Sequence, residues 1–175
     1  MAFFQFPLNA YILDLTDGSY LPFQFMPDDI ADTKQAQYTD YPIVGRSIPF
    51  RAYSGSGART VTLTLQFFTA PIEGFPAPTP DIIKLWIDKL RSYTYPDYRQ
   101  GILPPHRVML RIGFSIAMES IITQYNATPS KTWFGPGPIL PHGHSIQLTF
   151  EEIRAVPLSY NEVASYTAGF GFGAG

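Results

Sequence analysis

Residues 60–67 carry the pattern that most limits what this chain can fold into. Val61, Leu63, Leu65 and Phe67 alternate with three threonines and one glutamine. Because successive side chains of a β-strand point to opposite sides, this stretch predicts an antiparallel strand with one apolar face and one uncharged polar face. A sheet built from such strands must bury its apolar side, while its polar side can meet water or another protein.

The same alternation recurs in residues 107–126, which predict one long strand or two, and in residues 145–156, which predict the last strand. The side chains expected on their apolar faces are Val108, Leu110, Ile112, Phe114, Ile146, Leu148 and Phe150. These segments lie on the C-terminal side of the one convincing helix, and we expect them to complete the antiparallel sheet.

An early hairpin is predicted by the pair Asp17-Gly18, which lies between alternating segments at Tyr11–Leu15 and Tyr20–Met26. An Asp-Gly pair in that setting favours a tight turn. Residues 28–49, which follow, are polar and contain two prolines that a central strand would not tolerate. We therefore expect a long irregular connection there.

The stretch SIPFRAYSGSGARTVTLTLQFF, residues 47–68, places a Gly/Ser-rich turn between two predicted strands. A phosphate-binding loop would end in Gly-Lys-Ser/Thr and lead into a helix, whereas this turn leads into a strand. We therefore interpret the turn as the tip of a hairpin. Gly55 and Gly57 would supply the backbone freedom that such a tip requires.

The only convincing helix is predicted at about 80–93. Thr79 suits the N-cap position, Pro80 suits the first helical position, and Asp81 lies favourably at the positive end of the helix. Its apolar side chains fall at three- and four-residue spacing, at Ile83, Trp86, Ile87 and Leu90.

These elements predict a mainly β (α+β) fold, an antiparallel β-sandwich or barrel with one flanking helix. We expect a single domain over residues 1–175, with an N-terminal arm, proline-rich loops and a glycine-rich C-terminal tail.

The composition points towards a covered surface. Charged residues make up 15% of the chain, against roughly 25% in an average soluble protein. We interpret this as a sign that other subunits cover part of the surface, although a turn-rich β domain would also lower the charge. The net charge of −2 predicts no general affinity for polyanions, and no apolar run is long enough to cross a bilayer. The N-terminus has no basic segment typical of a secretory signal.

No residue set predicts catalysis or a cofactor. Cysteine is absent, which excludes thiolate chemistry. His142 and His144 could begin a metal site, but no third ligand is evident near them, so we expect no metal. Glu151 and Glu152 are adjacent and would face opposite sides of a strand, so they cannot act as a glycosidase pair. We therefore expect a protein that is not an enzyme.

The order of several motifs resembles a known family. The motifs are YLPFQFMPDDIADTKQAQY, IVGRSIPFRAYSGSGARTVTLTLQFF, a helix ending LRSYTYPDY, then PPHRVMLRIG and HSIQLTFEEI. In this order they resemble the tube-initiator or adaptor proteins in the baseplates of contractile-tailed phages and related contractile injection systems. The resemblance covers about residues 20–154. Many members of that family also carry a LysM domain, which has no counterpart in this sequence.

The resemblance implies a tail-tube fold and a homohexameric ring between the spike hub and the tail tube, in a virion baseplate assembled in the host cytoplasm. Other hub, tube and wedge proteins would be partners, and genomic DNA would only pass through the lumen. The threonines expected to face the lumen are Thr60, Thr62 and Thr64. The residues expected to shape the assembly interface are Gly45, Arg46, Pro49, Arg51, Gly55, Gly57 and Arg59.

Arg46 and Arg59 are further expected to pair with acidic groups across that interface. Two alternatives remain open at this point. The chain could be a tube terminator or a wedge or sheath adaptor of the same machine. It could also be a carbohydrate-binding β-sandwich that uses Trp133 and surface tyrosines.

Overall fold

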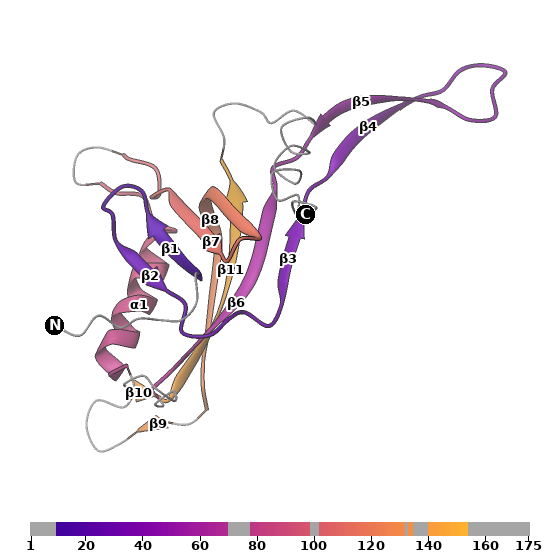
Figure 1. Cartoon of the computed structure of the whole chain (residues 1–175). Helices are drawn as coiled ribbons and strands as arrows, with labels where there is room; N and C mark the ends of the chain where they lie inside the picture. Colours follow the sequence, from indigo (N-terminus) through magenta and orange to yellow (C-terminus); the bar gives the residue numbers. More distant parts are fainter. Residues whose placement is uncertain (1–9, 70–77, 99–101, 132, 135–139, 154–175) are drawn as a thin grey trace, which may run out of the picture.

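The computed structural model of the chain describes residues 10–69, 78–98, 102–131, 133–134 and 140–153. The N-terminal segment, the C-terminal tail and much of the proline-rich loops expected from the sequence lie outside these ranges. Seven strands form the main sheet: β1 (Ala10–Asp14), β2 (Tyr20–Pro22), β3 (Ile30–Thr33), β6 (Thr60–Phe68), β7 (Val108–Ile112), β8 (Ile116–Pro129) and β11 (Gly143–Glu152). Their order is β2–β1–β7–β8–β11–β6–β3, with every pair antiparallel (Figure 1).

The remaining elements lie outside the main sheet. Strands β4 (Ala36–Tyr41) and β5 (Phe50–Ser56) pair only with each other, and β9 (Trp133–Phe134) pairs with β10 (Leu140–Pro141). The helix α1 (Pro80–Ser92) lies beside the sheet in Figure 1. A mainly β fold with antiparallel strands and one flanking helix is thus confirmed, and the helix lies where the sequence predicts it.

One face of the sheet packs beneath α1 and forms the core. Val61, Leu63, Leu65 and Phe67 of β6 are buried and its threonines are only partly buried, which confirms the predicted alternation. Ile83 and Leu90 of α1 are buried, and the ring of Trp86 packs on Phe67 with 5.6 Å between centroids. The buried face also takes in Ile12, Val108, Leu110, Ile112, Ile146, Leu148 and Phe150.

The start of α1 is set by backbone hydrogen bonds rather than by a side-chain cap. The amides of Ile82 and Ile83 donate to the carbonyl oxygen of Thr79, at 3.0 and 3.2 Å. The hydroxyl of Thr79 makes no capping bond, so only its N-cap position follows the sequence prediction. The backbone N–H at the first helical position has no partner within a helix, so Pro80, which lacks this group, loses no hydrogen bond there.

The first hairpin follows the sequence closely. Leu13 of β1 opposes Tyr20 of β2, and Gly18 between them has a φ of 73°. Such a left-handed backbone strains any residue with a Cβ, which explains the glycine. At the β7–β8 turn the prediction was wrong for Phe114, which is 79% exposed instead of lying on the apolar face. β7 ends at Ile112 and β8 begins at Ile116 opposite it, so Phe114 lies in the turn between the two strands.

Two further predictions about residues 28–68 were wrong. The expected irregular connection contains β3 and β4, and the expected hairpin at 47–68 does not form, because β5 pairs with β4 and β6 pairs with β3 and β11. The actual hairpin loop is 42–49. Pro42 directly follows β4 and Pro49 directly precedes β5, so both prolines flank the strands and remove no ladder hydrogen bond from within them.

The main sheet is not closed into a barrel by the described strands. Strands β2 and β3 lie at the two ends of the strand order, and each has one described neighbour. The sheet therefore keeps two open edges, and unpaired edges are available for contacts with other chains.

A substitution at Gly143 would test how tightly β11 packs against β6. A Cβ at this position would lie 3.0 Å from the carbonyl oxygen of Phe67 and still closer to the ring of Phe68. We expect Gly143→Ala to lower the free energy of unfolding by about 1–3 kcal/mol, the usual range for overpacking. Urea denaturation would measure the change.

Gly57→Ala is the matched control for this prediction. The nearest atom to a Cβ there is the carbonyl oxygen of Gln35 at 3.9 Å, so we expect a change within about 0.5 kcal/mol. Equal unfolding midpoints for the two variants would contradict the predicted clash.

Candidate assembly interface

A two-stranded arm is the most exposed part of the described structure. It consists of β4, the loop 42–49 and β5, and it extends away from the body of the molecule (Figure 1). All residues of β4 are exposed. At roughly 3.3 Å per residue, the six residues of β4 span about 20 Å. A lone two-stranded ribbon is marginally stable in water at best, so a surface that covers the arm would stabilise it.

The tip of the arm is built for a sharp reversal. Gly45 has a φ of 86°, a backbone conformation that favours glycine. The amide of Arg46 donates to the carbonyl oxygen of Ile43 at 3.1 Å, which closes the turn. These contacts explain locally why residues predicted from the sequence as part of an interface, Gly45, Arg46 and Pro49, lie at the end of the arm.

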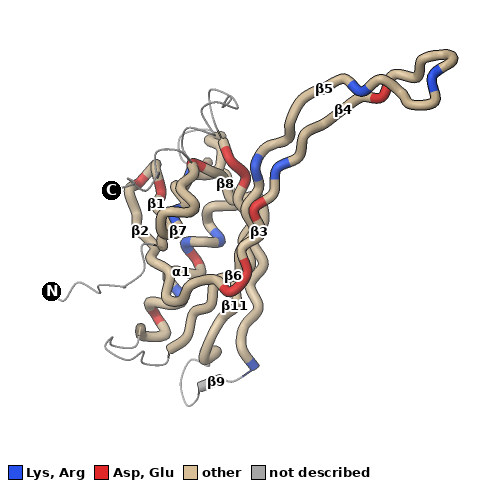
Figure 2. Tube along the Cα trace, turned by 45° about the vertical axis from the view of Figure 1, so that its right-hand side comes forward, with Lys and Arg blue, Asp and Glu red and all other residues tan. Residues whose placement is uncertain are grey.

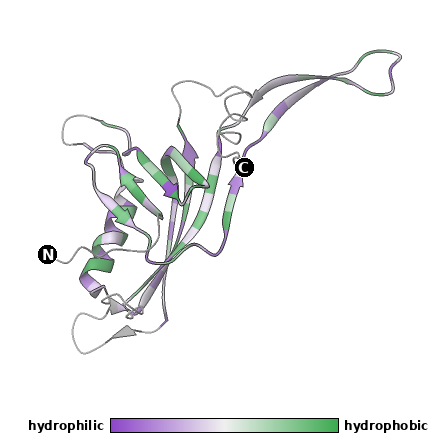
Figure 3. Cartoon of the chain, in the orientation of Figure 1, coloured by the Kyte–Doolittle hydropathy of each residue, from purple (hydrophilic) through white to green (hydrophobic). Residues whose placement is uncertain are grey.

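Large apolar side chains lie on the arm with little cover. Val44 is fully exposed and Ile48 is 75% exposed. Hydrophobic residues occur on the arm as well as within the body (Figure 3). Clustered exposed apolar groups mark interaction surfaces. The full set is Tyr38, Tyr41, Ile43, Val44, Ile48, Phe50 and Tyr53.

Charges on the arm are few. Nε of Arg51 lies 2.8 Å from Oδ1 of Asp40, directly across the ribbon. Because both side chains are well exposed, this pair contributes little stability. Arg46 forms no ion pair with any other described residue, which leaves it as the cationic group at the tip (Figure 2).

Arg59 lies where the arm joins the body, and its partner is in the same chain. Its guanidinium group forms an ion pair with Asp32 of β3. The hydrogen bond to Arg59 lowers the pKa of Asp32, and the same bond raises the pKa of Arg59. The pair holds β3 beside β6, so Arg59 is occupied within the chain, although the sequence had led us to expect it to pair across an interface.

The glycines at the base of the arm have different roles. Gly55 has a φ of 151° and opposes Gln37, next to an irregularity in the β4–β5 register. Gly57 does not have a positive φ, and its amide donates to the carbonyl oxygen of Gln35 at 2.9 Å. The structure therefore gathers all seven predicted interface residues along the arm and its base, although not in the hairpin that the sequence predicted.

The sheet face opposite α1 forms a second candidate surface. Thr60, Thr62 and Thr64 point to this face and oppose Glu151, Thr149 and Gln147 of β11. The hydroxyl oxygens of Thr62 and Thr149 lie 3.4 Å apart. We define the polar face as Thr60, Thr62, Thr64, Gln66, Gln124, Asn126, Thr128, Ser145, Gln147 and Thr149.

The polar face is rich in hydrogen-bonding groups. Its ten residues are uncharged, and one carboxylate, Glu151, lies beside them opposite Thr60. Figure 2 shows most of β6 and β11 in tan, the colour of residues other than lysine, arginine, aspartate and glutamate. The threonines of β6 are only partly buried, and no described element packs over them as α1 does over the opposite face. They are thus not enclosed between two layers.

A buried carboxylate joins β1, α1 and the segment before β7. The side chain of Asp14 is fully buried, and its Oδ1 accepts the amide of Thr16 at 2.8 Å. Its Oδ2 lies 2.7 Å from Nδ1 of His106 and 3.6 Å from Nζ of Lys89. A buried charge is tolerated only when it is paired and hydrogen-bonded, as it is here.

The cluster around Asp14 has the geometry of a ligand set but already contains a cation. Asp14, Asp17 and His106 offer ligand atoms within 4.8 Å of one another. Lys89 forms an ion pair with both carboxylates. Because its ammonium group supplies the positive charge there, we interpret the cluster as a structural brace.

The charges of this cluster shift two pKa values. Partial burial tends to raise the pKa of Asp17, but hydrogen bonds from Lys89 and Ser19 outweigh it and hold the pKa well below its usual range. Burial also tends to lower the pKa of Lys89, and its interactions with Asp17, Tyr93 and Asp14 raise it overall. Both groups are therefore held in their charged forms.

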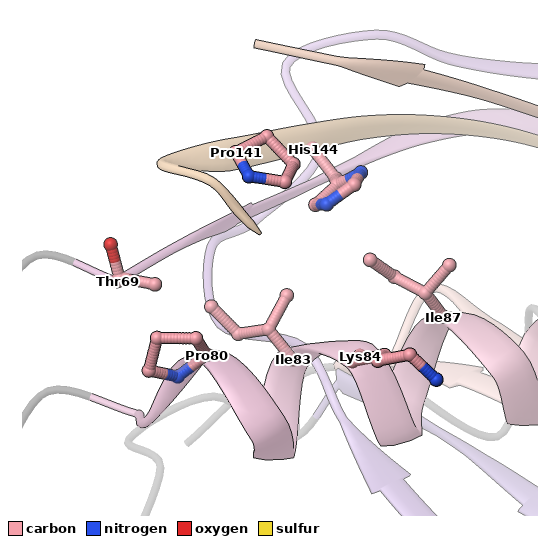
Figure 4. Close-up of a pocket in the computed structure, with 7 residues that line it drawn as sticks. All are labelled: Thr69, Pro80, Ile83, Lys84, Ile87, Pro141 and His144. Atoms are coloured by element: carbon pink, nitrogen blue, oxygen red, sulfur yellow. The ribbon is translucent and has the colours of Figure 1, made fainter. Parts of the chain in front are cut away.

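A small apolar pocket lies between the start of α1 and the sheet. Its volume is about 190 Å³, below the 300–1,000 Å³ typical of ligand sites. Figure 4 shows Pro80, Ile83 and Ile87 facing Pro141 and His144 across it. Burial lowers the pKa of His144, which favours a neutral ring.

The two histidines raised as potential ligands are used separately. Nδ1 of His142 lies 2.9 Å from the hydroxyl oxygen of Thr69, whereas His144 lines the pocket. Neither belongs to a cluster of three potential metal ligands among the described residues. The side chain of Trp133, considered for carbohydrate binding, lies outside what the structure describes.

The aromatic residues of the arm were missed in the sequence analysis. QAQYTDY and FRAYSGS each combine aromatic and small polar residues, and they flank a segment bracketed by Pro42 and Pro49 with Gly45 near its centre. That symmetry was the available signal for a hairpin. It was overlooked because the prolines were interpreted as excluding strands.

Comparison of the sequence with models of known protein families and with curated proteins finds no match. Among the described residues, no helix combines the length and apolar character that spanning a membrane requires.

Lys89→Met tests the brace around Asp14, because it keeps an apolar stem and removes the ammonium group. We expect the free energy of unfolding near pH 7 to fall by about 1.5–3 kcal/mol, the range of a hydrogen bond to a charged group. Because the folded-state pKa of Asp17 lies below its ordinary value of 3.8, its stabilisation is present above that pH and is lost as the pH falls through the folded-state pKa. The gap between variant and wild type should therefore narrow in acid.

Urea denaturation at neutral and acidic pH would measure this gap. Lys84→Met is the control, because Lys84 forms only an exposed pair with Asp88 on the same helix. We expect it to change stability by less than about 0.5 kcal/mol. A Lys89→Met gap that stayed constant down to strongly acidic pH would contradict the assignment.

Proposed function

We propose that this chain is a non-enzymatic structural subunit that assembles with copies of itself into a homohexameric ring. In this proposal the ring is a tail-tube initiator or adaptor in the baseplate of a contractile tail or related injection system. It links the spike hub to the tail tube and contacts other hub, tube and wedge proteins. The order of sequence motifs suggests the family, and the exposed arm supports a role in assembly.

The arm is the observation that carries the proposal. It has large apolar side chains, no described cover and, at its tip, Arg46, which forms no ion pair with another described residue. Such a surface is unfavourable in water and favourable against a partner. The two open edges of the main sheet add backbone groups that neighbouring subunits can pair with. A repeated contact between different surfaces of identical chains closes into a ring when its rotation allows.

The polar face supports the proposal that this side of the sheet lines a lumen. A duct that passes DNA requires a wetted surface without many lysines or arginines, because these would retain the phosphates. The polar face offers hydroxyl and amide groups and contains no lysine or arginine, and the one charge beside it, on Glu151 opposite Thr60, is negative. In this proposal Thr60, Thr62 and Thr64 line the lumen, and α1 lies on the outside of the ring.

A tube terminator or a wedge or sheath adaptor would use the same arm and the same sheet. These roles differ in which proteins lie above and below the ring. Imaging of an intact tail, with the subunit located by a tag, separates them: a position between spike hub and tube supports the initiator role. A position at the far end of the tube or outside it would contradict that role.

The tip of the arm offers a direct test of assembly. Val44→Asp combined with Ile48→Asp places charge on two side chains that contact no core, so the melting temperature should stay within about 2 °C of wild type. We expect the purified variant to remain monomeric at concentrations where wild type forms rings, measured by light scattering and electron microscopy.

Phe114→Asp is the matched control for the tip, because Phe114 is similarly exposed but lies at the β7–β8 turn. We expect it to assemble as wild type does. Rings from the tip variant, or a wild-type chain that remains monomeric at every concentration, would contradict the proposal.

A cysteine placed on the polar face tests the lumen. The native sequence has no cysteine, so Thr64→Cys introduces a unique thiol. In assembled rings we expect a small maleimide to label this thiol and a polyethylene-glycol maleimide to be excluded. Labelling would be followed by the mass of the protein.

Lys84→Cys is the control for this labelling, because Lys84 is exposed on α1, on the other side of the sheet. We expect both reagents to label it in the ring. Equal labelling of Thr64→Cys by both reagents in intact rings would place the polar face on the outside and contradict the lumen assignment.

A further inference from the structure

The arm carries aromatic side chains on both of its faces. Opposed residues in an antiparallel ribbon share a face, and successive pairs alternate between faces. Tyr41 opposes Phe50 on the first face, and Tyr38 opposes Tyr53 on the second. Between these pairs Asp40 opposes Arg51, on the same face as the two tyrosines.

The two faces are about equally exposed. Tyr41 and Phe50 are each 54% exposed, and Tyr38 and Tyr53 are 59% and 61% exposed. The rings of Tyr38 and Tyr53 pack edge to face with 5.8 Å between centroids, so they form one apolar unit. A ribbon that lay on a single surface would bury one of these pairs and leave the other in water.

We propose that the arm inserts between two other copies of this chain, with each face against a different copy. This inference rests on the proposed ring function and adds that each arm joins two neighbours at once. The arm is then a wedge whose two faces and tip are all buried in the assembly.

The size of the exposed surface supports another protein surface as the occupant. The seven apolar side chains of the arm together expose on the order of 800 Å², when each aromatic ring offers about 150–250 Å² in full. One partner contributes about that area to a standard protein–protein interface. The arm therefore supplies about one partner's share of a standard interface, which the proposal divides between two neighbouring copies.

Charge and apolar complementarity favour further copies of this chain as that occupant. The arm, residues 36–56, has two arginines and one aspartate and carries +1, and since the whole chain carries −2, the remainder carries −3. The body also has an exposed apolar patch that its own arm does not cover. This patch, after α1, consists of Tyr95, Tyr98, Ile102 and Leu103.

Two double variants separate the faces. Tyr41→Ser with Phe50→Ser removes the first pair of rings, and Tyr38→Ser with Tyr53→Ser removes the second. We expect each to weaken ring assembly by at least about tenfold, the loss of a typical interface hot spot. Sedimentation over a concentration series would measure it. Tyr38→Phe with Tyr53→Phe keeps both rings and is expected to assemble as wild type.

A photo-crosslinking amino acid at position 50 or 53 provides a measurement that does not depend on these variants. Within rings of otherwise wild-type chains, we expect position 50 to link to one segment of a neighbouring copy and position 53 to a different segment. Mass spectrometry of the linked peptides identifies both. Linkage of both positions to the same segment, or of only one position, would overturn the wedge.

The outcomes distinguish this inference from the function on which it rests. Rings that tolerate the loss of one face refute the wedge and leave the ring intact. If the wild-type chain forms fibres instead of rings, and both double variants abolish them, the ring is refuted and the wedge is supported. A chain that is monomeric at every concentration refutes both, and cross-links only to proteins of other sequence refute copies of this chain as the occupant.

Discussion

One-sided burial of the seven-stranded sheet is the constraint on which the rest of the molecule depends. The buried apolar side chains of the core strands lie on the face beneath α1. A shift of one residue in any register would move those side chains to the opposite face, so the alternation fixes the pairing. The same alternation makes the opposite face polar. The core and the polar face are therefore two results of one pattern.

The arm differs from the body in how it is stabilised. The body has its helix-covered core and the buried Asp14 brace, which joins segments far apart in the chain. The arm has cross-strand pairs, a surface ion pair and a glycine turn, none of which buries much area. In the proposed assembly its remaining stabilisation comes from other chains. This division between a self-sufficient body and a dependent extension supports an assembly subunit better than it supports a ligand-binding domain.

The sequence predicted the elements whose signals are local. Three elements have signals that lie within a few residues: the strand at Val61–Phe67, the turn at Asp17-Gly18 and the helix after Thr79. All three formed as predicted. The pairing of β5 was not local. Gly55 and Gly57 looked like a hairpin turn, but the choice between β4 and β6 as partner depends on the whole sheet, since β6 already has β3 and β11 on its two edges.

The glycines and arginines of the candidate interface were predicted from the sequence, but its exposed aromatic residues were not. The glycines and arginines drew attention because turns and charges have recognisable residue types. Tyr38 and Phe50 did not, because an aromatic residue in a strand is as consistent with a core as with a contact surface, and only exposure separates the two. The pairing of Arg59 with Asp32 likewise depends on β3 lying beside β6, a neighbourhood that no local motif encodes.

The strand order also has a consequence for the order of events during synthesis. β1 must wait for β7, nearly a hundred residues later in the chain, before it gains its inner neighbour, whereas β4 and β5 are separated by eight residues and can meet early. Contacts between distant segments form slowly, and a local ribbon forms within microseconds. A nascent chain would thus expose its apolar arm before its own body has folded. If the arm binds other copies as proposed, arms of chains translated from the same messenger RNA could associate too early, unless each body folds before those arms meet.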